Sequence, residues 1–431
     1  MTARALKIAA LCVVVSVTTL LVTDWLGTVE GQQASVPGAG FAAVPGQKGG
    51  QDVFGPYDPV QQWPRPLSES LPNHEGWTWS QATDVFPESA DRVIVAQKGE
   101  LPVLPAGRGR GTTWLPQIGP SLKFPIGGGV PIREAASATP SFGRAAADGS
   151  DGRPGVDWRW EHVIAVFDRN GRMVEDWSQW DKIWGRPHDV EISPYDPQKH
   201  VWIVDDHNHA LFKFSPDGKQ LVQTIGTPGK VGADGAHFNR PTFLAWLPDG
   251  TMFVADGYNG TRVAKFDRDG KFLLAWGQRG EPGGREMRPG YFNTVHGIAA
   301  DPMTRRVYVS DRSNRRIQVF DENGQFVDQW PVGAQTNLQF LIIPADRSGI
   351  WGFTDTTARV AKWSFDGRLL YSWGVLGDFP GAFFNMHGAS VDQEGNLYIA
   401  EVGGGRVQKF RPRQGANPAY LVGRPVYAAW K

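Results

Sequence analysis

From residue 163 onward, short runs of alternating apolar and polar residues recur, each bounded by a turn rich in Asp, Gly or Pro. Runs of four to eight residues with this alternation predict β-strands rather than helices. One landmark returns six times: a strand ends in an aromatic residue and runs into a turn, as in AVFDRNG (165–171) and AKFDRDG (264–270). Such turns between alternating strands are hairpin signals. The pattern therefore predicts an all-β chain built from a repeated hairpin unit.

The landmark aromatic residues set the period of the repeat. Successive landmarks lie 43 to 54 residues apart, at Phe167, Phe214, Phe266, Phe320, Trp363 and Phe410. A period of about 40–50 residues with four strands per unit is typical of a β-propeller. Residues 76–160 must supply the inner strands of the first unit, so we predict six blades. A terminal blade built from both ends of the chain would close the ring, although the sequence does not identify the closing strand.

Charged residues recur within the units. The second strand of each unit after the first landmark ends in an acidic residue, at Asp205, Asp256, Asp311, Asp355 or Glu401. An arginine follows a few residues later in most units, at Arg262, Arg316, Arg359 and Arg406. Asp and Glu at such places commonly accept turn hydrogen bonds. We interpret these residues as part of each blade's own architecture, because catalytic residues are expected to break a repeat rather than obey it.

Three histidines do break the repeat. His188 in GRPHDV, His296 in NTVHGI and His387 in NMHGAS each open an inner strand, and we call them the histidine triad. The equivalent position holds Thr242 in PTFLAW, and NLQFLI (337–342) contains no histidine. The triad therefore occupies the second, fourth and sixth blades, about 120° apart in a six-fold ring. Three neutral imidazoles with one open side form a catalytic zinc arrangement, whereas any one of them alone would be read as a packed or capping residue.

The remaining histidines have no counterparts in other blades. His207 and His209, in DDHNHA, lie on the connection after the second strand of their blade, and we interpret them as surface residues. The same interpretation applies to His74, His162, His200 and His237.

Two further side chains are candidates for the channel mouth. Tyr258, in ADGYNGTR, follows the acidic turn of the third blade, and Arg312, in SDRSNRR, occupies the matching place in the fourth. Such a turn can bring a phenol beside a metal on the axis, and a guanidinium there could hold a carboxylate in a bidentate pair. A surface tyrosine and a solvated arginine are the alternatives.

The composition limits the partners. Lys+Arg and Asp+Glu each total 44 among 431 residues, so the formal net charge is zero. A nucleic-acid-binding domain carries a clustered excess of basic residues, so we expect no nucleic-acid partner. We expect a monomer whose partner is a small-molecule or peptide substrate.

The N-terminus predicts export. Arg4 and Lys7 precede an uncharged run, residues 8–22, which is shorter than the roughly 20 residues that a spanning helix needs. The run fits the hydrophobic part of a signal peptide, but no A-x-A cleavage site follows, so an uncleaved membrane anchor stays open. Cys12 lies inside this run and is the only cysteine, so the exported part has no disulfide. We expect a periplasmic or secreted protein whose only membrane contact is this segment.

The chain divides into three parts. Residues 1–26 form the signal peptide or membrane anchor. Residues 27–75 are rich in Gly and Pro and are interpreted as a linker or wrapped arm. Residues 76–431 form the propeller.

The motifs resemble those of a known family. The repeat is of the NHL type, and residues 160–412 are similar to the lyase domain of peptidylglycine α-amidating enzymes (peptidyl-α-hydroxyglycine α-amidating lyase). The matching segments are PHDV, IVDDHNHALFKF, RPTFLAW, VADGYNGTRVAKF, VHGIA, VSDRSNRRIQVF and MHGASVDQEGNLYIAE. NHL repeats are common, and the histidine motifs with DGYNGTR between the first two are more specific.

The resemblance implies a zinc-dependent lyase that cleaves a carbinolamide C–N bond to give an amide and glyoxylate. It implies that the triad binds zinc, that Tyr258 acts as the base and that Arg312 helps to hold the substrate carboxylate. It also implies an arginine just before the first landmark, for which Arg153 in DGRPG and Arg159 in WRWEH are both candidates.

The sequence departs from the family after the last histidine. In the family an Asp there helps to bind a structural calcium, whereas this chain has Gly388, and Asp189 instead follows the first histidine. A structural calcium is therefore an open expectation beside the zinc.

Two other functions are compatible with the sequence. A non-enzymatic NHL propeller would bind a protein, peptide or glycan on one face, because propellers support many functions. A lactonase-like propeller hydrolase would use carboxylate and Asn ligands for calcium in the channel, and the three histidines argue against it.

Overall fold

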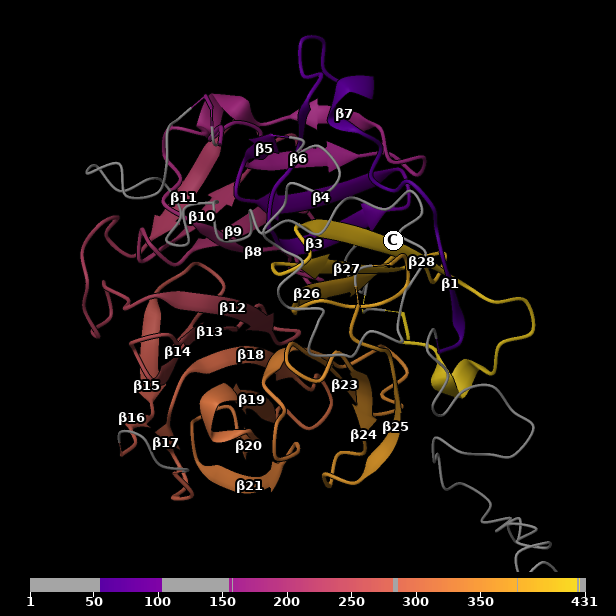
Figure 1. Cartoon of the computed structure of the whole chain (residues 1–431). Coiled ribbons are helices and arrows are strands. Elements are labelled where there is room, and N and C mark those ends of the chain that lie inside the picture. The colour runs from indigo at the N-terminus through magenta and orange to yellow at the C-terminus, as the bar shows by residue number, and fades with distance from the viewer. Residues whose placement is uncertain are drawn as a thin grey trace, which may run out of the picture.

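The computed structural model describes residues 55–102, 155–156, 158–281, 286–377, 379–424 and 426. Within these residues the chain is all-β, and six four-stranded antiparallel sheets stand around one axis as a six-bladed propeller (Figure 1). The predicted fold class and the predicted number of blades are both confirmed.

The first three blades follow the chain, each from its inner to its outer strand. Blade one contains β3 (Ala82–Ser89), β4 (Arg92–Gln97), β6 (Ile164–Phe167) and β7 (Met173–Asp176). Blade two contains β8 (Pro187–Ile192), β9 (Val201–Asp205), β10 (Ala210–Phe214) and β11 (Leu221–Ile225). Blade three contains β12 (Pro241–Trp246), β13 (Met252–Asp256), β14 (Arg262–Phe266) and β15 (Phe272–Trp276).

The next two blades repeat this order. Blade four contains β18 (Val295–Ala300), β19 (Val307–Asp311), β20 (Arg316–Phe320) and β21 (Phe326–Pro331). Blade five contains β22 (Leu338–Ile342), β23 (Ile350–Thr354), β24 (Val360–Trp363) and β25 (Leu369–Trp373).

Blade six is completed by the N-terminal part of the chain. Its strands are β26 (Met386–Val391), β27 (Leu397–Glu401), β28 (Arg406–Pro412) and, outermost, β1 (Tyr57–Pro59). Tyr57 pairs with Pro412, and its ring packs 5.7 Å from Trp373 of blade five. The propeller therefore begins before residue 76, and the segment interpreted as a linker contributes the strand that closes the ring.

Short elements decorate the blades. Two small sheets pair β2 (Trp77–Trp79) with β5 (Glu100–Pro102) and β16 (Gln278–Arg279) with β17 (Tyr291–Phe292). Single 3-10 turns occur at η1 (Leu67–Glu69), η5 (Ser178–Trp180), η6 (Arg312–Asn314) and η7 (Pro418–Tyr420). The described part of the chain holds no helix with the length and apolarity to span a membrane. Residues 1–26 lie outside it.

The landmark pattern is explained by packing between blades. All six landmark aromatic residues are buried. The Trp that ends one blade rests on the turn glycine of the next: a Cβ added to Gly218, whose φ is +67°, would lie 2.1 Å from Trp177. Only glycine combines that left-handed conformation with so close a ring. The recurrent aromatic residue, turn glycine and Trp are thus parts of the hydrophobic core.

Four of the five recurrent acidic residues stabilise their own blade, as predicted. Carboxylate–arginine pairs join Asp256 to Arg262 and Asp311 to Arg316, both at 2.8 Å, and Glu401 to Arg406 at 3.1 Å. Asp205 instead accepts backbone N–H groups, including those of Gly185 and Arg186 at 2.7 and 2.8 Å. All four carboxylates are buried, so these hydrogen bonds satisfy groups that would otherwise be costly to bury.

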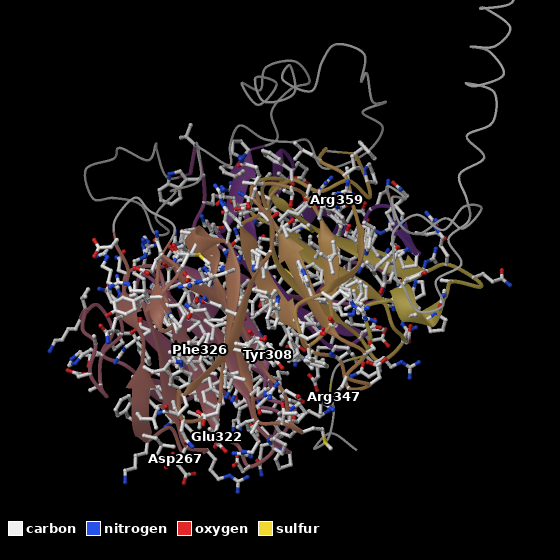
Figure 2. The ribbon with its side chains drawn as sticks, turned by 90° about the horizontal axis from the view of Figure 1, so that it is seen from below. Asp267, Tyr308, Glu322, Phe326, Arg347 and Arg359 are labelled. Carbon is white, nitrogen blue, oxygen red and sulfur yellow. The ribbon has the colours of Figure 1, made fainter. Side chains whose placement is uncertain are left out.

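The connections between strands define two faces of the disc. Seen from its edge in Figure 2, Arg359 lies at one face, on the connection between the second and third strands of blade five. Asp267 and Glu322 lie at the opposite face, in the last hairpins of blades three and four (Figure 2). Tyr258 and Arg312 belong to connections of the same kind as Arg359. The structure thus places both candidates at one end of the axis.

Candidate metal centre on the propeller axis

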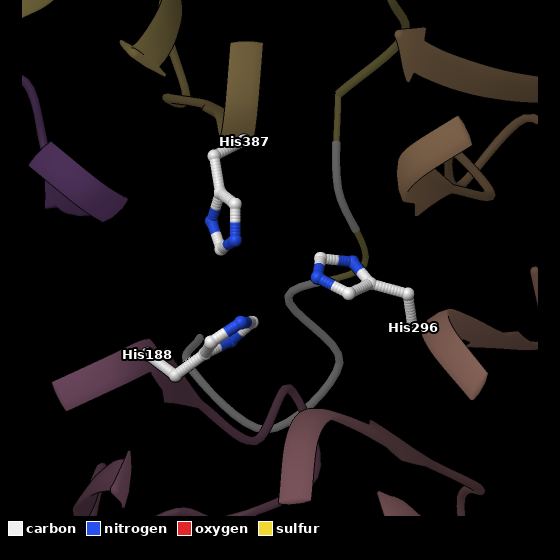
Figure 3. A group of neighbouring side chains, drawn as sticks. All are labelled: His188, His296 and His387. Atoms are coloured by element: carbon white, nitrogen blue, oxygen red, sulfur yellow. The ribbon is translucent and has the colours of Figure 1, made fainter. Parts of the chain in front are cut away.

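The histidine triad meets on the axis. His188 comes from β8, His296 from β18 and His387 from β26, and the three imidazoles converge in Figure 3. Their ring centroids lie 4.5 to 5.1 Å apart, and one nitrogen from each lies within 4.8 Å of the other two. All three side chains are buried. Alternate blades therefore bring together the three residues that the repeat pattern singled out.

Each imidazole is oriented by the following blade. The Nδ1 atoms of His188, His296 and His387 lie 3.0, 2.8 and 2.6 Å from the backbone carbonyl oxygens of Thr242, Gln339 and Thr83. A carbonyl oxygen only accepts, so each Nδ1 carries the proton and each Nε2 presents its lone pair. Thr242, Gln339 and Thr83 are the residues that occupy the histidine position in the neighbouring blades.

A backbone irregularity aims these side chains at the axis. The pairing of the inner strand with the second strand shifts register at the histidine position, between Pro187 and Asp189, Val295 and Ile298, and Met386 and Gly388. The same shift occurs in β3, β12 and β22, which carry no histidine. Such a bulge re-aims a side chain and is common beside functional sites. The fold thus provides six axial positions, and the sequence puts histidine in three of them.

The electrostatics keep the triad neutral. Burial, together with the His387 imidazole and Arg186, lowers the pKa of His188 well below its usual value. Burial and Arg312 do the same for the pKa of His296, and burial lowers the pKa of His387 to about 3. Neutral imidazoles with fixed tautomers are the form that ligates a divalent metal. The three residues therefore fit a divalent metal ion.

The two sides of the triad differ. The Tyr258 hydroxyl lies 3.1 Å from Nε2 of His188 and 3.2 Å from Nε2 of His296. Phe243, one residue beyond the axial position of β12, packs its ring 5.0 to 5.5 Å from all three imidazoles. Tyr258 thus stands where a substrate could approach the nitrogens, and an apolar ring seals the centre elsewhere.

Cations surround Tyr258. The guanidinium carbons of Arg240, Arg312 and Arg186 lie 4.4, 5.2 and 5.5 Å from the centre of its ring. Arg186 and Arg240 both bind the buried carboxylate of Asp206, whereas Arg312 donates to the side-chain oxygen of Gln339 at 3.1 Å. Three guanidinium groups against one carboxylate leave an excess of positive charge beside Tyr258, which suits a substrate carboxylate.

Blade one supplies a further cation that the sequence interpretation missed. Lys98, just after β4, is buried, and its ammonium group contacts the side chain of Gln81. Burial, and then the charge of Arg186, lower the pKa of Lys98 to about 7, and the charge of Lys98 contributes to the low pKa of His387. Lys98 therefore belongs to the charged surroundings of the triad.

Of the two arginines predicted before the first landmark, the described one, Arg159, does not lie beside the triad. Arg153 lies outside the described residues. Arg159 stacks on Trp77 at 4.0 Å and lies 3.8 Å from Glu100, away from the axis, because it precedes β6, the third strand of its blade. Lys98 follows the second strand and is better placed to reach the axis.

A sequence signal for the missed arginines does exist. Arg186 and Arg240 each precede a proline, and each stands two residues before the axial position of its blade, in GRPHDV and NRPTF. The structure shows that this matched offset directs both side chains to Tyr258. The second Asp of IVDDHNHA, Asp206, is their shared partner.

Several histidines interpreted as surface residues lie deeper than expected. His162 is buried and its Nδ1 lies 2.6 Å from a carboxylate oxygen of Glu100. His207 and His209 are half-buried, and His209 accepts the backbone N–H of Arg240. Burial lowers the pKa of His207 to about 4. The surface interpretation was wrong for His162, whose partner Glu100 is remote in sequence, and it understated the packing of the other two.

A buried acidic cluster of Asp84, Asp189 and Glu191 explains why the residue after the last histidine is Gly388. A Cβ at Gly388 would lie only 1.8 Å from Oδ1 of Asp84, so Asp84, from the neighbouring blade, fills the space of a side chain at 388. Asp189 and Glu191 on β8 lie close by, and burial raises the pKa of Asp84 to about 7 and the pKa of both others well above their usual values. One carboxylate oxygen each on Asp84 and Asp189 has no hydrogen-bond partner among the described residues.

Fold and site together define a six-bladed β-propeller with three axial histidines. No protein-family model matches the chain. Several curated proteins are similar to part of it. Peptidyl-alpha-hydroxyglycine alpha-amidating lyase 1 of Drosophila melanogaster is 29% identical over 278 residues, which are 60% of this chain and 50% of the relative. NHL repeat-containing protein 3 of Mus musculus is 29% identical over 308 residues, 64% of this chain and 80% of that protein.

Peptidylglycine alpha-amidating monooxygenase of Rattus norvegicus is 35% identical over 162 residues, 37% of this chain and 16% of the enzyme. The chain thus spans half the length of the fly lyase and a smaller part of the rat enzyme. A solved structure of streptogramin B lyase is 10% identical, with a TM-score of 0.43 over 80% of this chain and 96% of that one, too distant to inform function. The curated relatives confirm the resemblance to amidating lyases and NHL proteins.

Proposed function

We propose that this protein is a zinc-dependent lyase of the peptidylamidoglycolate type. It would cleave the carbinolamide C–N bond of a peptidyl-α-hydroxyglycine or a related small carboxylate to give an amide and glyoxylate. The triad carries the proposal: three neutral imidazoles meet on the axis, and a backbone carbonyl orients each of them so that its Nε2 presents a lone pair. Relatives from fly and from Caenorhabditis elegans are named as amidating lyases, the second as a probable one, which supports the same reaction.

His188, His296 and His387 would hold the zinc ion. When bound, the metal supplies Lewis acidity toward the substrate hydroxyl. The donor set of three histidine nitrogens with one open side is the kind that catalytic zinc uses.

Tyr258 would move the proton. Its hydroxyl lies 3.1 and 3.2 Å from two triad nitrogens, within reach of a substrate hydroxyl presented to the triad. Tyr258 would take the hydroxyl proton while the C–N bond breaks and the hydroxyl carbon becomes the aldehyde carbon of glyoxylate, and it would then pass that proton to the amide nitrogen. The atoms balance without water and without any change of oxidation state.

The cations beside Tyr258 would hold the substrate carboxylate. Arg312 is the best placed group, because its guanidinium is bound by the neutral side chain of Gln339 and not by a carboxylate. Lys98 adds a charge on the opposite blade. A fixed carboxylate orients the hydroxyl toward the triad, and positioning of this kind is a large part of enzymatic rate enhancement.

The buried acidic cluster would hold calcium. Asp84, Asp189 and Glu191 offer only oxygen ligands, the preference of Ca²⁺, and two of these oxygens lack hydrogen-bond partners among the described residues. We expect Ca²⁺ to raise the melting temperature of the wild type and to leave an Asp84→Asn variant unchanged. An equal shift in both proteins would remove calcium from the proposal.

The reaction is tested with a synthetic α-hydroxyglycine-extended peptide. We expect the purified zinc-loaded protein to release glyoxylate, and we expect His188→Ala to release none while His200→Ala stays active, because His200 lies outside the centre and pairs with Asp196. If the zinc-loaded wild type releases no glyoxylate, the lyase proposal is wrong and a non-enzymatic binding propeller becomes the favoured function. Export to the periplasm or medium and a monomeric state are part of the same proposal, to be checked by fractionation and light scattering.

A further inference from the structure

A second group of metal-ligand residues lies away from the axis. His74, Glu100, Glu161 and His162, which we call the rim cluster, each offer one ligand atom, and these atoms all lie within 4.8 Å of one another. Glu100 belongs to β5, the other three to the segments that precede β2 and β6. The cluster therefore joins the N-terminal part of the chain to blade one.

His74 has the same orientation device as the triad. Its Nδ1 lies 2.9 Å from the carbonyl oxygen of Pro72, which accepts, so Nδ1 carries the proton and Nε2 presents its lone pair. Nε2 is buried without a hydrogen-bond partner in the described part of the chain, and it faces carboxylate oxygens of Glu100 and Glu161 at 3.5 and 3.9 Å. A lone pair that faces two carboxylates is stabilised by a cation placed among the three ligand atoms.

Glu100 is the buried anchor of the cluster. Its side chain has no exposed surface, and Oε1 lies 2.6 Å from Nδ1 of His162. Among the residues that the structure describes, Oε2 has no hydrogen-bond partner, and the guanidinium of Arg159 stays 3.8 Å away on the ring of Trp77. A buried carboxylate oxygen without a partner is costly, and a bound metal would use it.

We propose that the rim cluster is a second metal site, which takes a divalent ion of the zinc class through His74, His162, Glu100 and Glu161. Two imidazoles and two carboxylates form a donor set that zinc accepts. Tetrahedral zinc with bonds of about 2.0–2.1 Å puts its ligand atoms roughly 3.3 Å apart, and the spacings of 3.5 and 3.9 Å around His74 are close to this. The 2.6 Å contact of His162 with Glu100 would have to lengthen on binding.

The site would be structural and independent of the lyase reaction. Glu161 is half exposed, which gives an ion access from solvent, whereas the other three side chains are mostly buried. A bound ion would fix the loop that carries His74 onto blade one, beside the packing of Trp63, Leu67 and Trp79 against that blade.

The metal-free alternative is an ion pair. Burial alone would lower the pKa of His162, but its hydrogen bond to Glu100 and the charge of Glu100 raise that pKa overall. A protonated His162 could then pair with Glu100 without any metal, and metal content decides between the two arrangements.

The test measures zinc in the full-length protein after reconstitution and gel filtration. We expect two zinc ions per chain in the wild type, one in His188→Ala and none in the double variant His188→Ala/His74→Ala. We expect His74→Ala alone to keep one zinc ion and its glyoxylate release. Glu75→Gln, beside the cluster but outside its ligand set, is the matched control and should keep two.

Cobalt substitution provides a second test in case the His74→Ala variants fail to fold. On the His188→Ala background, one equivalent of Co²⁺ should give the visible spectrum of a four-coordinate site, and exposed Glu161→Gln should weaken its binding. A His188→Ala protein that binds neither zinc nor cobalt overturns the rim site, whatever happens to the lyase reaction. The rim site is overturned equally if His188→Ala/His74→Ala holds as much zinc as His188→Ala alone.

Discussion

Blades two, four and six and blades one, three and five share one backbone and differ in chemistry. Every inner strand carries the same register shift at its axial position. The even blades put histidine there, and the odd blades put Thr83, Thr242 and Gln339 there, whose carbonyls orient those histidines. The odd blades therefore supply the geometry that makes the even blades a metal centre.

The largest effect should follow from removing a ligand of an even blade. We expect His296→Ala to abolish zinc binding on the axis and to reduce glyoxylate release to background, because two imidazoles do not complete the set. The odd-blade counterpart Thr83→Ala keeps the backbone carbonyl that holds His387 and should retain the metal. Metal analysis and a glyoxylate assay of the two proteins check this, and equal losses in both would erase the distinction between the blades.

The next effect separates metal binding from proton transfer. Tyr258→Phe should keep the metal and lower kcat by about 10²- to 10⁴-fold, the usual contribution of general acid–base catalysis. Tyr195→Phe, beyond the far end of β8, is the control. Steady-state kinetics with metal analysis measures both changes, and an unchanged kcat in Tyr258→Phe would remove this residue from the mechanism.

A smaller effect is expected at Gly388 and Asp84, which each follow the axial residue of their blade. Gly388→Asp should destabilise the protein by about 1–3 kcal/mol, because the new side chain overlaps the carboxylate of Asp84. Asp84→Gly in the same chain should relieve part of that loss, since the two carboxylates compete for one space. Urea unfolding of the two single variants and the double variant gives the coupling. Strictly additive losses would show that Asp84 does not fill the place of a side chain at 388.

The smallest effect concerns pH. With a pKa of about 7, Lys98 is charged below pH 7 and loses its charge as the pH rises through 7, so substrate carboxylate binding should weaken on the alkaline side. We expect KM to rise about fivefold between pH 7 and 8, the fall in protonated fraction for such a group. Lys98→Arg, which stays charged, should flatten the profile. A wild-type KM that does not change over this range would exclude a role for Lys98 in binding.

The sequence predicted the features that the repeat exposes. The aromatic landmarks predicted six blades, and the triad stood out because His188, His296 and His387 occupy a position that other blades fill differently. Features without a repeat were harder to predict. The closing strand β1 is only three residues long, too short for alternation to show.

Contacts between distant segments were missed for a physical reason. Lys98 reaches the centre from blade one, and nothing local to this residue marks that direction. Glu100 and His162 are 62 residues apart in the chain, so burial of His162 depends on a tertiary contact that no local pattern encodes. Arg186 and Arg240 could have been found by aligning the blades on the axial position.

The most direct test of the central claim is glyoxylate release before and after removal of the metal. The wild type stripped by a chelator should be inactive, and one equivalent of zinc beyond that taken up by His296→Ala should restore it. The His296→Ala protein should stay inactive at every zinc concentration. A stripped wild type that keeps its full rate would contradict the assignment of the three axial histidines as the metal centre of a lyase.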